Sequence, residues 1–286
     1  MANLKELRSR ITSVSSTMQI TSAMKMVSAA KLNRAQDAIT KMRPYSEKLT
    51  ELLQNLSSTL EGDTGSKYAE QREVRKVLIV AISSNRGLAG AFNTNIVKGV
   101  RQLAANKYSG KEVELLTLGK KAADVLKKTF TISKNNNAIY DHLDYSSVAE
   151  IAEELMQLFL EGEYDEISII YNQFRNAATQ VVTTEQFLPI QKFETDENVV
   201  LDYIFEPSKL EIVKDLIPKS LKMQLFKAMS DSLASEHGAR MTAMHKATDN
   251  ATELRDSLKL SYNKARQASI TNEILEIVGG AEALNN

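Results

Sequence analysis

The sequence predicts a Rossmann-like α/β domain flanked by N- and C-terminal helices that pair with each other as a long antiparallel coiled coil. Apolar residues recur at heptad spacing over residues 1–60. Over 61–207, short β-branched runs alternate with helical stretches, which is typical of a mainly parallel sheet covered by helices. Helical periodicity returns over 208–286. We therefore divide the chain into an N-terminal coiled-coil helix (1–60), an α/β base domain (61–207) and a C-terminal coiled-coil helix (208–286).

The first helix carries the most regular pattern. Alternating steps of three and four residues from Leu4 to Leu60 reach seventeen positions, of which thirteen are apolar. Such a seam is typical of a coiled coil sustained over many heptads. Asn3 is expected to cap this helix, and Pro44 is expected to kink it, because proline removes a backbone donor and clashes with the preceding turn.

Three successive seam positions of this helix are polar: Thr21, Lys25 and Ser28. Polar seam residues weaken helix pairing. Either the register of the coiled coil drifts here, or this stretch faces a second protein as well as its helix partner. In the second case Lys25, Lys31 and Arg34 would be solvated or would meet an acidic surface.

The middle region reads as alternating strands and helices. Its last two strands are expected to form an antiparallel hairpin or a sheet edge. Asn135, Asn136 and Asn137 are expected to form a loop. The strands are expected over 77–82, 113–118, 167–171 and 181–188, and the helices over 91–106, 120–128 and 146–161.

The last helix is expected to run from about residue 208 to 284, with a bend at Pro218. Its seam is looser than the first and its phase is expected to slip near 261–262. At 1.5 Å per residue this helix would reach roughly 115 Å, against roughly 85 Å for the first. An unpaired tip of small and apolar residues should follow from that difference. The expected seam begins with Met244, Ala247, Ala251, Leu254 and Leu258.

Charge and composition limit the possible partners. The chain has a net charge of zero, but residues 1–60 carry nine Lys and Arg against four Asp and Glu, so an acidic partner is expected there. Nucleic acid is not expected, because Tyr45 is the only aromatic residue in that arm. There is no cysteine, no apolar run long enough to span a membrane and no signal-like start. We expect a cytoplasmic location, with membrane association only through partners.

No residue pattern predicts chemistry on this chain. Gly87-Leu88-Ala89-Gly90 follows a strand but lacks the spacing and the lysine of a phosphate-binding loop, so a structural or interaction loop is favoured, with Arg86 as its one charge. His142, His237 and His245 form no metal-binding or catalytic set. We predict no catalytic residue, no cofactor and no metal.

Three motifs resemble those of the gamma subunit of bacterial-type F-type ATP synthases, and the resemblance covers the whole chain. Residues 17–32 read TMQITSAMKMVSAAKL and residues 83–93 read SSNRGLAGAFN. Residues 268–281 read ASITNEILEIVGGA, which is similar to the family signature. The stretch ASEHGARMTAM at 234–244 adds support.

The resemblance implies a non-catalytic rotor shaft that couples rotation of the membrane c-ring, driven by protons or sodium ions, to conformational change in three alpha and three catalytic beta subunits. It implies a peripheral position on the cytoplasmic face of a bacterial inner membrane. It also implies epsilon as a partner at the base. The residues implied to meet the alpha/beta ring are Met24, Lys25, Met26, Arg34, Arg266, Gln267, Thr271, Glu273 and Glu276. The implied bearing tip consists of Ile274, Ile277, Val278 and Ala281. The implied contacts with epsilon or the c-ring are Tyr203, Glu206 and Pro207.

The chain departs from the family at two places. Many members have cysteine where Ala89 stands, and the cysteine insert of chloroplast gamma subunits is absent.

Two alternatives from other classes remain: a static coiled-coil scaffold, which would self-associate through its arms, and a nucleotide-binding α/β enzyme.

Overall fold

The computed structural model describes residues 4–58, 67–141, 143–190 and 209–284. The chain forms two units, one consisting of Ala29–Arg240 and the other of Met1–Ser28 together with Met241–Asn286. The helices α1 (Leu4–Ser58) and α5 (Lys209–Leu284) contribute to both units. The expected domain boundaries near residues 60 and 207 lie outside the described residues, so the three-part division stays a prediction.

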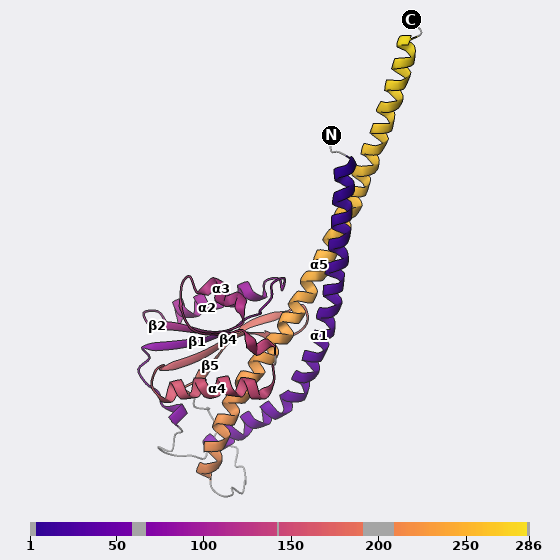
Figure 1. Ribbon diagram of the computed structural model, residues 1–286. Coiled ribbons are helices and arrows are strands. Elements are labelled where there is room, and N and C mark those ends of the chain that lie inside the picture. Colours follow the sequence, from indigo (N-terminus) through magenta and orange to yellow (C-terminus); the bar gives the residue numbers. More distant parts are fainter. Residues whose placement is uncertain (1–3, 59–66, 142, 191–208, 285–286) are drawn as a thin grey trace. The chain divides into compact units, whose positions relative to one another are not determined.

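A five-stranded sheet in the order β3-β2-β1-β4-β5 forms the centre of the larger unit (Figure 1). Its strands are β1 (Lys76–Ile82), β2 (Glu112–Leu118), β3 (Thr131–Asn136), β4 (Glu166–Phe174) and β5 (Gln180–Leu188). The first four are parallel, and β5 pairs with β4 in the antiparallel direction, as predicted for the last two strands. Residues Val77–Ile82 of the central strand are buried on both faces, which explains why that run is continuously apolar.

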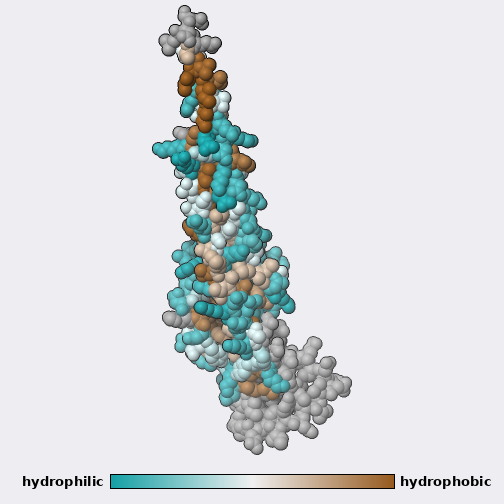
Figure 2. Space-filling view, turned by 90° about the vertical axis from the view of Figure 1, so that its right-hand side faces the viewer, coloured by the Kyte–Doolittle hydropathy of each residue, from teal (hydrophilic) through white to brown (hydrophobic). Residues whose placement is uncertain are grey.

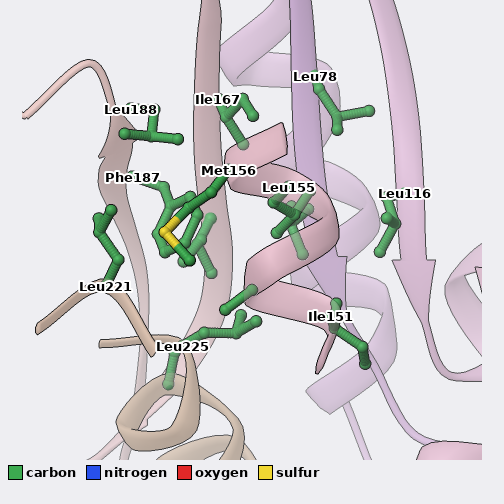
Figure 3. Packing of buried hydrophobic residues seen from close by; sticks show 14 of the residues in the cluster. Leu78, Leu116, Ile151, Leu155, Met156, Ile167, Phe187, Leu188, Leu221 and Leu225 are labelled. Carbon is green, nitrogen blue, oxygen red and sulfur yellow. The ribbon is translucent and has the colours of Figure 1, made fainter. Parts of the chain in front are cut away.

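Helices cover both faces of the sheet. The helices α2 (Phe92–Asn106) and α3 (Lys120–Leu126) pack on one face. The helix α4 (Tyr145–Leu160) and the first turns of α5 pack on the other. In Figure 3, Met156 of α4 lies between the sheet residue Ile167 and Leu225 of α5, and Leu155 belongs to the same buried cluster. The predicted doubly covered α/β layer is confirmed.

The strand β3 was not expected, and its last residues, Asn135 and Asn136, fall in the predicted loop. The reason is physical: β3 is an edge strand that pairs only with β2, and most of its side chains are exposed. An edge strand needs no apolar run, so its polar sequence gives no period to detect. Lys134 in this strand forms an ion pair with Glu154 of α4 at 2.6 Å, which holds the edge against the helix layer.

In the smaller unit α1 and α5 pair as antiparallel helices. The guanidinium of Arg8 donates to the hydroxyl of Tyr262 at 2.9 Å, and Thr248 Oγ1 donates to Thr21 Oγ1 at 2.8 Å. Residues early in α1 therefore lie beside residues late in α5. The predicted seam is confirmed: its positions from Leu7 to Ser28 are all buried or half-buried, and in the larger unit Leu32 and Ile39 continue it.

The expected seam of α5 was wrong at one position. Leu254 is 51% exposed, and Arg255 lies inward instead, with its guanidinium 3.4 Å from the sulfur of Met18. An arginine can occupy a seam because its aliphatic stem packs while its head reaches solvent. With Arg255 in the seam, the half-buried positions continue through Leu258 and Tyr262, so the expected slip near 261–262 does not occur.

The two helical prolines do not end their helices. The helix α1 runs from Leu4 to Ser58 through Pro44, and α5 contains Pro218. The expected cap Asn3 and the expected last seam residue Leu60 lie outside the described residues.

Candidate interaction surfaces on the helices and the α/β domain

The polar seam block of α1 is satisfied within the coiled coil. Thr21 bonds to Thr248, and the Ser28 hydroxyl donates to the carbonyl of Met24 at 2.8 Å. The register is therefore kept, which argues against local drift. The apolar neighbours Ile20 and Val27 lie outside the seam and are exposed. Of the two alternatives for this stretch, the geometry favours a face that meets a second protein.

The predicted ring contacts on α1 differ in their surroundings. Met26 is 64% exposed, whereas Met24 and Lys25 are half-buried. The Nζ of Lys25 lies 3.4 Å from Nδ1 of His245, and that same ring nitrogen lies 3.3 Å from a carboxylate oxygen of Asp249. Lys25 thus contacts α5 and is not solely a solvated cation. Arg34, which belongs to the larger unit, is exposed.

The predicted contacts on α5 lie at the end of the paired stretch and beyond it. Because Arg8 pairs with Tyr262, the start of the described α1 lies about one helical turn further along α5. Past that point the helix has no partner among the described residues. The predicted ring contacts on this stretch, Arg266, Gln267, Thr271, Glu273 and Glu276, are all exposed.

The end of α5 exposes apolar side chains. Ile277 is 71% exposed, and Ile274, Val278 and Ala281 are also exposed. Figure 2 shows this end of the helix as a hydrophobic surface. Gly279 and Gly280 have no neighbour within 4 Å of the position of an added Cβ. Several large apolar side chains exposed together on one helix indicate a surface for another protein.

The third predicted group, Tyr203, Glu206 and Pro207, lies outside the described residues, so its position stays a prediction.

The loop after β1 is closely packed at its start. The Tyr140 hydroxyl donates to the carbonyl of Ser83 at 2.6 Å. Gly119, at φ +110°, approaches Ser83 so closely that an added Cβ would lie 2.2 Å from that carbonyl oxygen. The Ser84 hydroxyl donates to the carbonyl of Arg86 at 2.7 Å. The backbone N–H of Ser83 donates to the carbonyl of Leu118 at 2.8 Å, and that of Ser84 donates to Oδ1 of Asn93 at 3.0 Å. These two donors are engaged within the protein, which favours the structural and interaction reading of this loop. Leu88, with φ +63°, is 63% exposed.

A buried polar cluster on α5 was not foreseen. Arg240 and Glu236 form an ion pair at 2.6 Å, and both side chains are buried. Nη2 of Arg240 also donates to the carbonyls of Arg86 and Gly87, at 3.2 and 3.3 Å. The four-residue spacing of Glu and Arg was visible in the sequence, but the same spacing is common on solvated helices, and only the fold reveals the burial.

Burial shifts the pKa values in this cluster. Burial raises the pKa of Glu236 above its ordinary range, although the positive charges of Arg240, Lys31 and Arg86 act in the opposite direction. Burial, together with Arg240 and Lys31, lowers the pKa of His237 to about 4. His237 is therefore neutral at physiological pH.

Among the described residues, no group of three or more His, Cys, Asp or Glu is arranged to hold a metal ion. No helix in the described part of the chain is long and apolar enough to cross a membrane.

Comparison with known proteins decides the family. A family model described as ATP synthase matches residues 3–284. The ATP synthase gamma chain of Christiangramia forsetii is 76% identical over 285 residues, with 100% of each chain covered. That of Flavobacterium johnsoniae is 68% identical over 286 residues, also with 100% of each chain covered. The chain belongs to the ATP synthase gamma chain family.

Solved structures agree with this ATP synthase gamma chain assignment. A chain from the central stalk and c-ring of the Tetrahymena thermophila mitochondrial ATP synthase is 27% identical, with a TM-score of 0.58, and the match covers 80% of this chain and 99% of that one. A chain from the Euglena gracilis mitochondrial ATP synthase is 22% identical, with a TM-score of 0.70 over 98% of this chain and 94% of that one, and it supports the fold. The chain is a non-catalytic, central-stalk subunit of an ATP synthase, as the resemblance implied.

Proposed function

We propose that this gamma chain is the rotating shaft that couples a proton- or sodium-driven c-ring to the catalytic beta subunits, at the cytoplasmic face of a bacterial inner membrane. The single observation that carries the proposal is the exposed end of α5. Ile274, Ile277 and Val278 are exposed on a helix that continues beyond Tyr262, the partner of Arg8 near the start of the described α1. A helix end with several exposed large apolar side chains requires a partner that covers them.

A ring of three alpha and three beta subunits fits this requirement. The Tetrahymena and Euglena structures come from a central stalk with c-ring and from an F1 and c-ring assembly. An asymmetric helix pair that turns inside a threefold ring presents a different face to each catalytic site. Contacts that differ in free energy between conformations of beta would then shift those conformations in turn, with no chemistry on the shaft.

The contact residues have separate roles in this proposal. Met24, Lys25 and Met26 on α1 and the exposed polar residues of α5, from Arg266 to Glu276, meet the ring. Ile274, Ile277, Val278 and Ala281 form a bearing, because an apolar surface makes few directional bonds that would hold it at one angle. Arg34 and Lys25 are proposed to meet an acidic loop of a partner.

Tyr203, Glu206 and Pro207 are proposed to contact epsilon and the c-ring. This assignment rests on the family resemblance. Contact with the membrane is then made through these partners.

Reconstitution tests the proposal. Alpha and beta are assembled with and without the chain, and ATP hydrolysis is measured together with rotation of a probe attached to the α/β domain. Stepwise rotation driven by ATP supports the shaft. A stable complex that hydrolyses ATP without rotation would reduce the chain to a static scaffold, and the proposal would be wrong.

A further inference from the structure

The junction between α5 and the loop after β1 is held by one buried side chain. Arg240 is 8% exposed, and its guanidinium reaches two different elements. Nη1 donates to Glu236 one turn earlier on α5, at 2.6 Å. Nη2 donates to the carbonyls of Arg86 and Gly87 in the loop. Arginine suits this position because its planar fork of donors is rigid.

The surroundings of Arg240 make the junction tight. Ala239 packs with Ala89 and Phe92 in a small buried cluster directly beside these bonds. One residue earlier, Gly238 lies so close to the β4–β5 hairpin that an added Cβ would be 3.1 Å from the carbonyl of Ala177. Over these few residues α5 therefore contacts two loops of the α/β domain at close range.

Glu236 completes the arrangement. Its carboxylate neutralises Arg240 and fixes the direction of the guanidinium. Lys31 on α1 and Arg86 on the loop also act on Glu236 electrostatically. A buried ion pair contributes little net stability compared with an apolar pair of similar volume, so its presence needs another explanation. The bonds that Arg240 makes to the loop provide one.

We propose that Arg240, oriented by Glu236, is a positioning residue that locks the β1–α2 loop to α5, so that torque on the α/β domain passes to the shaft helix without slip. The inference rests on the proposed function, because only a rotating shaft carries torque. It predicts that loss of the lock uncouples hydrolysis from ion transport while the complex still assembles.

The test is made in the complete ATP synthase. The double substitution Glu236→Leu with Arg240→Met removes both charges together and so avoids leaving one buried charge unpaired. The measured ratio is that of ATP-driven ion pumping to ATP hydrolysis. We expect assembly to persist and this ratio to fall at least about fivefold, the lower end of typical coupling effects. A ratio equal to that of the unsubstituted enzyme would overturn the inference.

A matched control separates the lock from general weakening of the helix. The ion pair between Lys222 of α5 and Glu153 of α4 also ties the shaft helix to the α/β domain, but it does not involve the loop. Glu153→Leu with Lys222→Met should leave the pumping ratio unchanged. An equal loss of coupling in this control would overturn the specific role of Arg240.

A rescue experiment keeps the inference testable if the double variant assembles poorly. The chain contains no cysteine, so Ala89→Cys with Ala239→Cys introduces the only possible intramolecular pair. Added to the double variant, the oxidised cross-link should restore coupling and its reduction should abolish it. A cross-link that forms without restoring coupling would contradict the lock. If the unsubstituted chain itself fails to rotate, the proposed function is wrong, which is a separate outcome.

Discussion

At the scale of single residues, burial decides what the polar groups of α5 do. The sequence predicted only that His237 belongs to no metal-binding or catalytic set, and the fold buries it beside Lys31 and Arg240. Glu236 and Arg240 were quoted only as part of a motif. The residue types and the spacing of Glu236 and Arg240 could be read from the sequence. Their burial could not, because the elements that cover them come from distant parts of the chain.

His237 should make stability depend on pH. Its pKa is lowered from 6.5 to about 4 by burial and by the nearby positive charges, so the folded chain favours the neutral ring. The contribution of His237 to the free energy of unfolding is complete above about pH 6.5. It is lost as the pH falls toward 4, with a slope of at most about 1.4 kcal/mol per pH unit. Chemical denaturation of the chain and of His237→Gln between pH 4 and 7.5 measures it.

The raised pKa of Glu236 changes stability with pH in the opposite direction to His237. Because Glu236 is present in both proteins, its effect cancels in their difference, which then reports on His237. The difference in free energy of unfolding should shrink as the pH falls. A difference that stays constant over the whole range would contradict the account.

Gly119 should tolerate no side chain. Its φ of +110° disfavours any L residue, and an added Cβ would lie 2.2 Å from the carbonyl of Ser83. Gly119→Ala should destabilise the chain by about 3 kcal/mol or more, since it adds backbone strain to a backbone clash. Gly110→Ala is the control: it also has positive φ but has nothing within 4 Å of the added atom, so it should cost clearly less. Thermal unfolding of both variants measures the two losses of stability. Equal losses for Gly119→Ala and Gly110→Ala would contradict the packing argument.

At the scale of elements, the sequence could predict whatever repeats with a period. The apolar runs of β1, β2 and β4 and the heptads of α1 were readable because burial imposes the pattern. The edge strand β5 was readable from its β-branched residues. The edge strand β3 was not, because it is short and its sequence, TISKNN, is mostly polar. Leu254 was misplaced because an apolar residue was preferred to Arg255, whose half-buried side chain contacts Met18.

The end of α5 gives a prediction at this scale. Ile274→Asp with Ile277→Asp should leave the unfolding temperature of the isolated chain nearly unchanged, because both side chains are exposed. Assembly with alpha and beta, or ATPase coupling of the complex, should be impaired, because two charges would enter an apolar bearing. Gel filtration of the complex and its ATPase measure this.

Val125→Asp serves as the control, since Val125 is an exposed apolar residue on α3. It should assemble normally. Unimpaired assembly and coupling in the double variant of α5 would refute the bearing assignment.

At the scale of the whole molecule, the α/β domain and the paired helices serve one function in this account. The sheet provides a rigid body through which force enters, and α5 is a single helix that belongs to both units. The family and the fold could be read from motifs that cover the whole chain. The lock at Arg240 could not be read from the sequence, because its partners Arg86 and Gly87 stand 154 and 153 positions earlier in the chain.

Rotation of a probe fixed to the α/β domain of the assembled complex tests the central claim most directly. With ATP, we expect unidirectional stepwise rotation for the unsubstituted chain and impaired rotation for the chain with Ile274→Asp and Ile277→Asp. ATP hydrolysis by the intact complex with a stationary probe would contradict it.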